Sequence, residues 1–244
     1  MKKYLAVIVS ALVLVGTACA QSIPSQNAAG YIKQTLNRGE LNLLASPFEK
    51  FDGNVPTIEE VVGTDILPAG TTIFFWDVDG QVYDSITYKD DFFFTGWDPA
   101  ATAATPFPRG RGFFVSIPAS AAEASYDLFF HGEVPDAQSA PTGTSVELKT
   151  GLQMVSFSYP VSIAITDPGL NIGLNPGVAG AVAAAGDTVF SWDPAVGYGS
   201  MTYKDDFFSQ GWDNPAFVFE PGKGYFYLSV GDKTWNELKP YAWP

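Results

Sequence analysis

The sequence predicts an all-β protein built from two tandem repeats, each of β-sandwich or barrel type, with at most one or two short helices. Three observations predict this class. Aromatic residues make up 15% of the 244 residues, and 24 glycines and 18 prolines interrupt the chain. Aromatic side chains suit a pleated sheet, whereas Gly and Pro mark the turns between short strands. The third observation is an internal repeat, which is read before any other pattern.

The repeat is centred on the segment Tyr-Lys-Asp-Asp-Phe-Phe, which begins at Tyr88 and again at Tyr203, 115 positions later. Both copies continue to a Gly-Trp-Asp segment. A spaced pattern of this length indicates a tandem duplication. The flanking matches are the Trp-Asp pairs at 76–77 and 192–193 and the Gly-x-Gly motifs at 110–112 and 222–224.

We predict a first β repeat over residues 21–137 and a second over 138–244. The stretch 134–142 is rich in Pro, Ala and Ser, which is typical of a boundary between structural units. Each repeat is long enough to enclose a core of its own. The sequence does not decide whether the repeats are independent domains or one packed unit.

Residues 1–20 have the pattern of a signal peptide. Lysines at 2–3 precede a short apolar run over 5–15, and Ala18-Cys19-Ala20 fits a small-x-small cleavage site. We therefore expect cleavage near Ala20 and a secreted or cell-surface protein. Lipid attachment at Cys19 is the alternative, but Gly16 occupies the position where such a site needs a Leu-like residue. Simple cleavage would remove the only cysteine, so no disulfide is expected.

The chain is acidic, with a formal net charge of −13 that becomes −15 if the two lysines of the signal peptide are removed. This charge argues against binding to nucleic acid, whose affinity depends on Lys and Arg at phosphates. It argues equally against anionic membrane surfaces. It is compatible with divalent cations or neutral glycans. No transmembrane segment is expected after the signal peptide.

The first repeat contains one helix signal among its strand signals. Thr57 and Glu60 form a capping box, which predicts a short helix over 58–62. The continuous apolar run at 72–76 is typical of a strand buried on both faces. Asp79-Gly80 is expected to supply the positive φ angles of the hairpin turn that follows. Strands are expected at 31–36, 41–45, 72–76, 81–88, 111–117 and 126–130.

The second repeat is expected to follow the same order of elements. Its strands are expected at 146–148, 152–157, 188–192, 199–203, 224–230 and 234–238. Residues 168–186 are rich in Gly, Ala, Asn and Pro, which predicts a long loop.

A resemblance accompanies these patterns. The segments that carry it are Asn27-Ala28-Ala29-Gly30-Tyr31, Leu41-Asn42-Leu43-Leu44-Ala45-Ser46-Pro47-Phe48, Trp76-Asp77, Gly110-Arg111-Gly112-Phe113-Phe114-Val115 and Gly132-Glu133-Val134-Pro135. In this order they resemble a group of secreted bacterial all-β proteins with duplicated "NLLA-P-F … WDG … GxGFFV … GEVP" segments. The resemblance covers nearly the whole chain after residue 20. It implies a duplicated, secreted all-β protein and implies no activity.

The Tyr-Lys-Asp-Asp-Phe-Phe segments allow two interpretations. Adjacent acids followed by exposed aromatic rings would suit a cation or a sugar. Alternatively, Asp90-Asp91 and Asp205-Asp206 form turns whose side chains bind their own backbone, and the phenylalanines begin the next buried stretch. The turn interpretation is favoured, because a duplicated fold must also duplicate its turns.

Aromatic side chains give the candidate contacts for a ligand or partner. Trp76 and Trp192 lie in apolar runs and are expected in the core. Trp97 and Trp212 lie in Gly-Trp-Asp turns, so partial exposure is expected for them. The full candidate set is Trp97, Trp212, Tyr88, Tyr203, Asp98 and Asp213.

Metal and catalytic sites have little support in the sequence. Asp77-Val78-Asp79-Gly80 resembles the start of a calcium loop, but Tyr88 stands where the bidentate Glu is required. His131 is the single histidine, and no Gly-x-Ser-x-Gly motif accompanies it. No cofactor or metal is therefore expected.

The leading hypothesis is a non-enzymatic, secreted structural or interaction protein, such as a matrix, surface or filament subunit. Its partners would be copies of itself, joined by sheet edges or aromatic patches; an N-terminal strand that adds to a neighbouring sheet is one such mode. The alternative is a carbohydrate-binding module that uses exposed Trp and Tyr rings.

Overall fold

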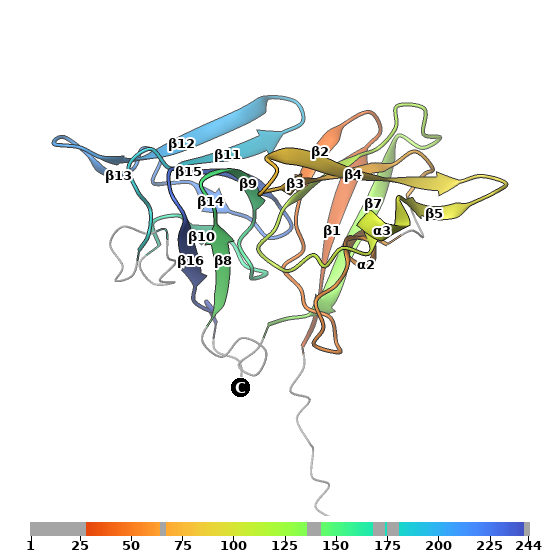
Figure 1. Ribbon diagram of the computed structural model, residues 1–244, viewed down its shortest axis with the longest axis horizontal. Helices are drawn as coiled ribbons and strands as arrows, with labels where there is room; N and C mark the ends of the chain where they lie inside the picture. The colour runs from red at the N-terminus through yellow and green to blue at the C-terminus, as the bar shows by residue number, and fades with distance from the viewer. Residues whose placement is uncertain (1–27, 64–66, 136–142, 168–173, 175–180, 242–244) are drawn as a thin grey trace, which may run out of the picture.

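The fold was analysed in a computed structural model, which describes residues 28–63, 67–135, 143–167, 174 and 181–241 (Figure 1). The expected signal peptide, Cys19, most of the expected inter-repeat linker and much of the predicted 168–186 loop lie outside these residues. Strands dominate, and the two helices are short. The all-β prediction is confirmed.

The strands occupy nearly all the ranges that the sequence predicts. The first half contains β1 (Ala29–Asn37), β2 (Leu41–Leu44), α2 (Ile58–Val62), β3 (Thr72–Asp77), β4 (Val82–Asp90), β5 (Thr95–Asp98), α3 (Ala100–Ala103), β6 (Phe113–Ser116) and β7 (Ser125–Glu133). The second half contains β8 (Thr144–Leu148), β9 (Gly151–Val155), β10 (Ile163–Ala164), β11 (Thr188–Asp193), β12 (Gly197–Asp205), β13 (Gln210–Trp212), β14 (Val218–Phe219), β15 (Tyr225–Ser229) and β16 (Lys233–Glu237).

The two halves contain five-stranded sheets with corresponding strand orders. The first sheet runs β2-β6-β3-β4-β5 and the second runs β9-β15-β11-β12-β13. Each half adds a two-stranded antiparallel sheet, β1-β7 in the first and β8-β16 in the second. The β10-β14 pair belongs to the second half alone among the described strands. The Tyr-Lys-Asp-Asp-Phe-Phe segments thus occupy corresponding hairpins, β4-β5 and β12-β13.

The predicted capping box is confirmed, whereas the predicted β3-β4 turn differs in its backbone angles. The capping box is present, with Glu60 N donating to Thr57 Oγ1 at 3.4 Å and Thr57 N donating to Glu60 Oε2 at 2.8 Å.

The prediction for the β3-β4 turn is wrong in one respect. The positive φ belongs to Gln81, at 49°, and not to Asp79 or Gly80. The Gln81 side chain stabilises this turn, because Nε2 donates to the Val78 carbonyl at 2.6 Å.

The N-terminal strand β1 pairs within its own chain. It is antiparallel to β7 along all nine residues, from Ala29 opposite Glu133 to Asn37 opposite Ser125. Within its own chain this segment is therefore one strand of a two-stranded sheet, and its addition to a neighbouring subunit's sheet stays a prediction. The strand is already used in covering the first core.

Each half has its own hydrophobic core between its five-stranded and two-stranded sheets. In the first, Ile73 and Phe75 of β3 pack with Leu128 and Phe130 of β7. In the second, Val189 and Tyr227 pack with Trp235 of β16. Large fully buried side chains such as Trp235 are expected to contribute most to stability, since stability scales with the apolar area buried.

The opposite faces of the two large sheets meet in a third, smaller cluster. Leu43 and Phe114 from the first half are buried against Met154 and Phe226 from the second. Trp76 and Trp192 are only partly buried at its margin, so the expectation that both are core residues holds in part. The alternate side chains of β3 thus face two different clusters, as the apolar run at 72–76 predicts.

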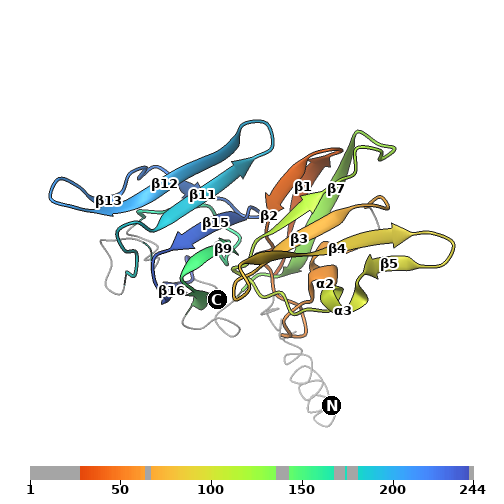
Figure 2. The ribbon, with the colours of Figure 1, turned by 45° about the horizontal axis from the view of Figure 1, so that its top comes forward.

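Reciprocal backbone hydrogen bonds join the halves. Gly224 N donates to the Leu43 carbonyl at 3.1 Å, and Gly112 N donates to the Met154 carbonyl at 3.3 Å. Ala45 N donates to the Gly222 carbonyl at 3.1 Å, and Ser156 N donates to the Gly110 carbonyl at 2.9 Å. Each bond has its counterpart at the corresponding position of the other half, so the contact is approximately two-fold symmetric. Figure 2 shows the two sheets side by side across this contact.

Candidate functional site

The four predicted aromatic contacts are buried. Trp97 is 3% exposed and Trp212 is 5% exposed, so the expected partial exposure of both is wrong. Each Trp lies across from a tyrosine of the adjacent strand, Tyr88 or Tyr203, with ring centroids 5.5 Å apart in both pairs. The reason is strand register. Both Trp side chains point to the core face of their hairpin, which a turn assignment from sequence does not reveal.

The predicted acids Asp98 and Asp213 stabilise the same hairpins. Lys89 Nζ forms an ion pair with Asp98 across β4 and β5. Lys204 Nζ lies 3.7 Å from Asp213, whose Oδ1 also accepts a hydrogen bond from Thr202 N at 2.9 Å. These contacts give both acids a structural role at the base of each hairpin.

The second acid of each Asp-Asp pair behaves as predicted. Asp91 Oδ1 accepts hydrogen bonds from Phe93 N at 2.8 Å and Phe94 N at 3.0 Å. Asp206 Oδ1 accepts from Phe208 N at 2.8 Å and from the next amide at 2.9 Å. These are side-chain-to-backbone turns of the kind that Asp favours. The turn interpretation is therefore confirmed for Asp91 and Asp206. Asp90 and Asp205 instead accept hydrogen bonds from side chains, Thr95 Oγ1 at 3.0 Å and Gln210 Nε2 at 3.3 Å.

The phenylalanines of these turns do not begin a buried stretch, and that part of the prediction is wrong. Phe92 and Phe207 are each 95% exposed, and Phe93 and Phe208 are each 92% exposed. Within each pair the rings contact edge to face, with centroids 5.3 and 5.2 Å apart. We call the pairs Phe92–Phe93 and Phe207–Phe208 the two aromatic tips.

The aromatic tips lie at opposite ends of the molecule. The β4-β5 hairpin ends at one extreme of the long axis and the β12-β13 hairpin at the other, in both views (Figures 1 and 2). The hairpins project beyond the cores, so the tips have solvent on nearly all sides. A signal in the sequence was available: two phenylalanines directly after an Asp that caps a tight turn must occupy the apex of that turn.

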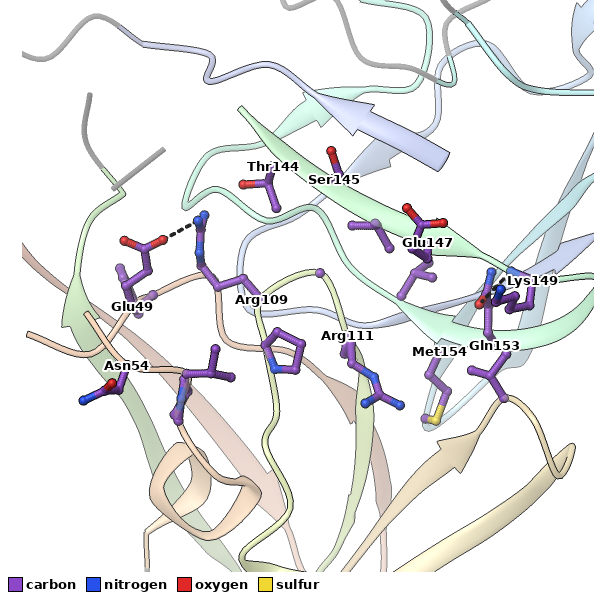
Figure 3. Close-up of a pocket in the computed structure, with 18 of the residues that line it drawn as sticks. Glu49, Asn54, Arg109, Arg111, Thr144, Ser145, Glu147, Lys149, Gln153 and Met154 are labelled. Carbon is purple, nitrogen blue, oxygen red and sulfur yellow. Dashed lines mark hydrogen bonds and ion pairs between the residues drawn. The ribbon is translucent and has the colours of Figure 1, made fainter. Parts of the chain in front are cut away.

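A cleft between the halves is the second feature of interest. It has a volume of about 520 Å³ and takes its lining from both halves. Figure 3 shows Thr144, Ser145 and Glu147 along β8, with Glu49 and Asn54 contributed by the first half. The sequence carries no local signal for this cleft, because the cleft forms only where two distant segments pack together.

The cleft's main charged groups already have protein partners. Arg109 Nη2 forms an ion pair with Glu49, and its Nη1 donates to the Ser158 carbonyl at 2.8 Å. Glu147 Oε1 accepts from Thr234 Oγ1 at 3.0 Å. Arg111 donates to the Trp76 carbonyl at 3.3 Å, and burial lowers the pKa of its guanidinium.

The hydroxyl groups of the cleft are also engaged. Thr144 Oγ1 donates to the Tyr159 hydroxyl at 3.1 Å, and Ser145 Oγ donates to Asn236 Oδ1 at 2.8 Å. His131 lies on β7, exposed and opposite Tyr31 in the neighbouring strand, and does not line this cleft. The arrangement therefore does not bring His131 to either hydroxyl.

The Asp-rich turn that resembles a calcium loop forms a hairpin turn. Asp77 Oδ1 accepts from Asp79 N at 3.0 Å, and Asp193 Oδ1 of the second half accepts from Ala195 N at 2.8 Å. Within the described residues, no group of three or more His, Cys, Asp or Glu side chains is placed to hold a metal ion. Nor does any helix in that part of the chain have the length and apolar character needed to cross a membrane.

Comparison with known proteins adds no assignment. The chain matches no protein-family model, no curated protein and no solved structure. Among the described side chains, the aromatic tips stand out, because all four of their phenylalanines are more than 90% exposed.

Proposed function

We propose that this protein is a non-enzymatic, extracellular structural or interaction protein that binds its partners through the two aromatic tips. The observation that carries the proposal is the exposure, above 90%, of all four tip phenylalanines. Full burial of a phenylalanine side chain is worth roughly 1.5–3 kcal/mol, and the tips leave this free energy unused in the isolated molecule. Exposed apolar patches on soluble proteins commonly mark interaction sites.

The hydrogen bonds of Asp91 and Asp206 add to this argument. Each carboxylate holds the two amides that follow its first phenylalanine, so the tip backbone is fixed before binding. A pre-organised tip loses less conformational entropy when it binds. Aromatic rings, with two χ angles, also present much area at a small entropic cost.

The non-enzymatic part of the proposal is supported by the engaged groups of the cleft. Glu49 is neutralised by Arg109, and the hydroxyls of Thr144 and Ser145 donate to groups in neighbouring segments. A nucleophile or a general base needs to be available to substrate. The extracellular location is carried by the signal-peptide pattern of residues 1–20.

The test is site-specific photo-crosslinking in the producing organism. A photoreactive phenylalanine analogue replaces Phe93 or Phe208, and in a matched control it replaces Val196. Val196 is 86% exposed and lies beside Gly197 at the turn between β11 and β12, away from the tips. Crosslinked products from the tip positions but not from Val196 are expected. Equal crosslinking at all three positions, or none at the tips, would contradict the proposal.

Glycan binding remains a second candidate, on a different surface from the one first expected. The buried Trp97 and Trp212 no longer support it. Tyr83 and Tyr198, which pack on Trp76 and Trp192 with centroids 4.7 Å apart, are 46% and 57% exposed. Loss of binding on a polysaccharide array after Tyr83→Ala and Tyr198→Ala would support it, whereas no binding by the unmodified protein would rule it out.

A further inference from the structure

We propose that the partner of each aromatic tip is an aromatic tip of a second copy of this chain, so that copies join end to end. This inference rests on the proposed function and names the partner of the same site. The structure supports it through the chemistry of the tips, their placement in the molecule and the charges around them.

The tips are self-complementary. Both consist of two phenylalanines in edge-to-face contact on the same kind of Asp-anchored turn, so both tips present a matching pair of exposed rings. The first tip adds Phe94, which is 41% exposed, where the second has Ser209. Each pair offers ring faces and ring edges to solvent. A second pair can therefore pack against it with the edge-to-face geometry that aromatic rings prefer. Tip-to-tip contact requires no pocket on the partner.

The placement of the tips favours end-to-end assembly of copies and disfavours attachment of both tips to one flat surface. Because the tips lie at opposite ends of the long axis, one flat bilayer would receive only one of them (Figures 1 and 2). A contact between tips uses both ends. Each added copy leaves one free tip, so the contact does not close on itself, and open linear assemblies follow.

The surrounding charges indicate how the contact depends on salt. Asp90 and Asp91 are exposed at the first tip, as are Asp205 and Asp206 at the second. The adjacent lysines lie near Asp98 and Asp213 at the hairpin base. Two tips that meet therefore bring like charges together. Salt screens such repulsion, so association is expected to strengthen as ionic strength rises.

The area of the contact sets its strength. Four phenylalanine side chains, at 150–250 Å² each, can bury at most about 600–1,000 Å² in total. Stable, specific interfaces bury roughly 1,200–2,000 Å². One tip-to-tip contact is therefore weak and reversible, and assembly requires a high local concentration.

The experiment is sedimentation velocity on the purified protein over a hundredfold concentration range, at low and at high NaCl. The unmodified protein is expected to grow beyond the dimer with concentration, and more so at high salt. The double variants Phe92→Ser/Phe93→Ser and Phe207→Ser/Phe208→Ser each retain one tip and should stop at the dimer. The fourfold variant should stay monomeric, and Val196→Ser should behave as the unmodified protein.

Three results would overturn the inference: a monomer under every condition, association that persists in the fourfold variant, or one-tip variants that grow past the dimer. Flotation with phosphatidylcholine vesicles separates this failure from failure of the proposed function. Tip-dependent flotation by a protein that stays monomeric would replace the self-partner with a lipid surface and leave the tips as binding elements. Photo-crosslinks from position 93 to a different protein would likewise rule out the self-partner and leave the tips as binding elements. Absence of any tip-dependent partner would remove both proposals.

Discussion

Gly224 lies against Leu44 so closely that a side chain would not fit between them. A Cβ atom at Gly224 would lie 2.7 Å from the Leu44 carbonyl oxygen, a backbone atom that cannot move aside cheaply. The corresponding position Gly112 is less crowded, with a Cβ 3.1 Å from the Val155 carbonyl oxygen. The second glycine of each Gly-x-Gly motif therefore lets the two halves approach.

Gly224→Ala is accordingly expected to destabilise the protein by about 1–3 kcal/mol, the usual cost of forcing atoms into a packed site. Gly112→Ala should cost less. Urea unfolding followed by tryptophan fluorescence measures both. Gly231→Ala is the control, because a Cβ there meets nothing within 4 Å. Equal effects of Gly224→Ala and Gly231→Ala would argue against close packing of the halves at this point.

Trp97→Ala and Trp212→Ala are expected to lower the free energy of unfolding by about 3–5 kcal/mol each, because both remove a large buried ring that packs on a tyrosine. Denaturant unfolding monitored by circular dichroism gives the values. Phe92→Ala and Phe207→Ala serve as exposed aromatic controls, with changes within about 0.5 kcal/mol. A Trp97→Ala variant as stable as the control would contradict the buried assignment.

Asp187 is a buried carboxylate with four partners. It accepts from Ala184 N at 2.8 Å, Tyr227 Oη at 2.7 Å and Val230 N at 2.9 Å, and it pairs with Lys233 Nζ. Asp187→Ala leaves the nearly buried Lys233 without its counter-charge, so a loss of about 3–5 kcal/mol is expected.

The thermal midpoint of Asp187→Ala, compared with that of Asp232→Ala, measures this loss. Asp232 is an exposed acid that accepts from Thr150. A small effect at both positions would show that the buried pair contributes little to stability.

Glu237 gives the fold a specific pH dependence. The residue is fully buried, and loss of hydration raises the pKa of its carboxyl to about 8, although hydrogen bonds from Ser158 act in the other direction. Below pH 4.5 the carboxyl is protonated in both the folded and the unfolded chain. As pH rises from 4.5 towards 8, the unfolded chain loses its proton first, so this group makes folding progressively less favourable.

Glu237→Gln should remove this effect, which is on the order of 4 kcal/mol between pH 4.5 and pH 9. Stability against urea, measured at several pH values in that range, should fall less with pH in Glu237→Gln than in the unmodified protein. Glu147→Gln, on the exposed side of β8, is the matched control. Identical pH profiles for Glu237→Gln and the unmodified protein would contradict a neutral buried carboxyl.

Asp91→Ala should loosen the first aromatic tip, because Phe93 N and Phe94 N lose their shared acceptor. The change is exposed, so global stability should alter by no more than about 1 kcal/mol. Faster chymotryptic cleavage next to Phe92 or Phe93, with cleavage at the second tip unchanged, is the expected result. Asp206→Ala is the reciprocal control: it should speed cleavage at the second tip alone, because Phe208 N and Ser209 N lose their acceptor. Unchanged cleavage at the first tip of Asp91→Ala would mean that the Asp91 bonds do not order that tip.

Much of the fold could be predicted from the sequence because its signals are local. The strand ranges, the Thr57 capping box and the Asp91 and Asp206 turns depend on neighbours a few residues away. The exposure of Trp97 could not be predicted in the same way. It depends on the register between β4 and β5, which sets the face that Trp97 shares with Tyr88.

The extent of burial of Trp76 could not be predicted either, because it depends on residues that are still more distant in the sequence. Its side of β3 is covered only where the second half packs against it, so burial at that position depends on residues more than 70 positions away. The cleft lined by Glu49 and Glu147 likewise exists only in the assembled fold. The exposure of the aromatic tips could have been predicted from the sequence, because it follows from the Asp91 and Asp206 turns.

The reciprocal bonds between Leu43 and Gly224 and between Met154 and Gly112 form a two-fold contact within a single polypeptide. Two-fold contacts of this kind usually join separate subunits, which dissociate on dilution. Here both partners are in one polypeptide, and tethering keeps the local concentration of each half near the other at a level that dilution does not change. The spacing between the two aromatic tips is therefore fixed within one chain and does not depend on the association of separate subunits.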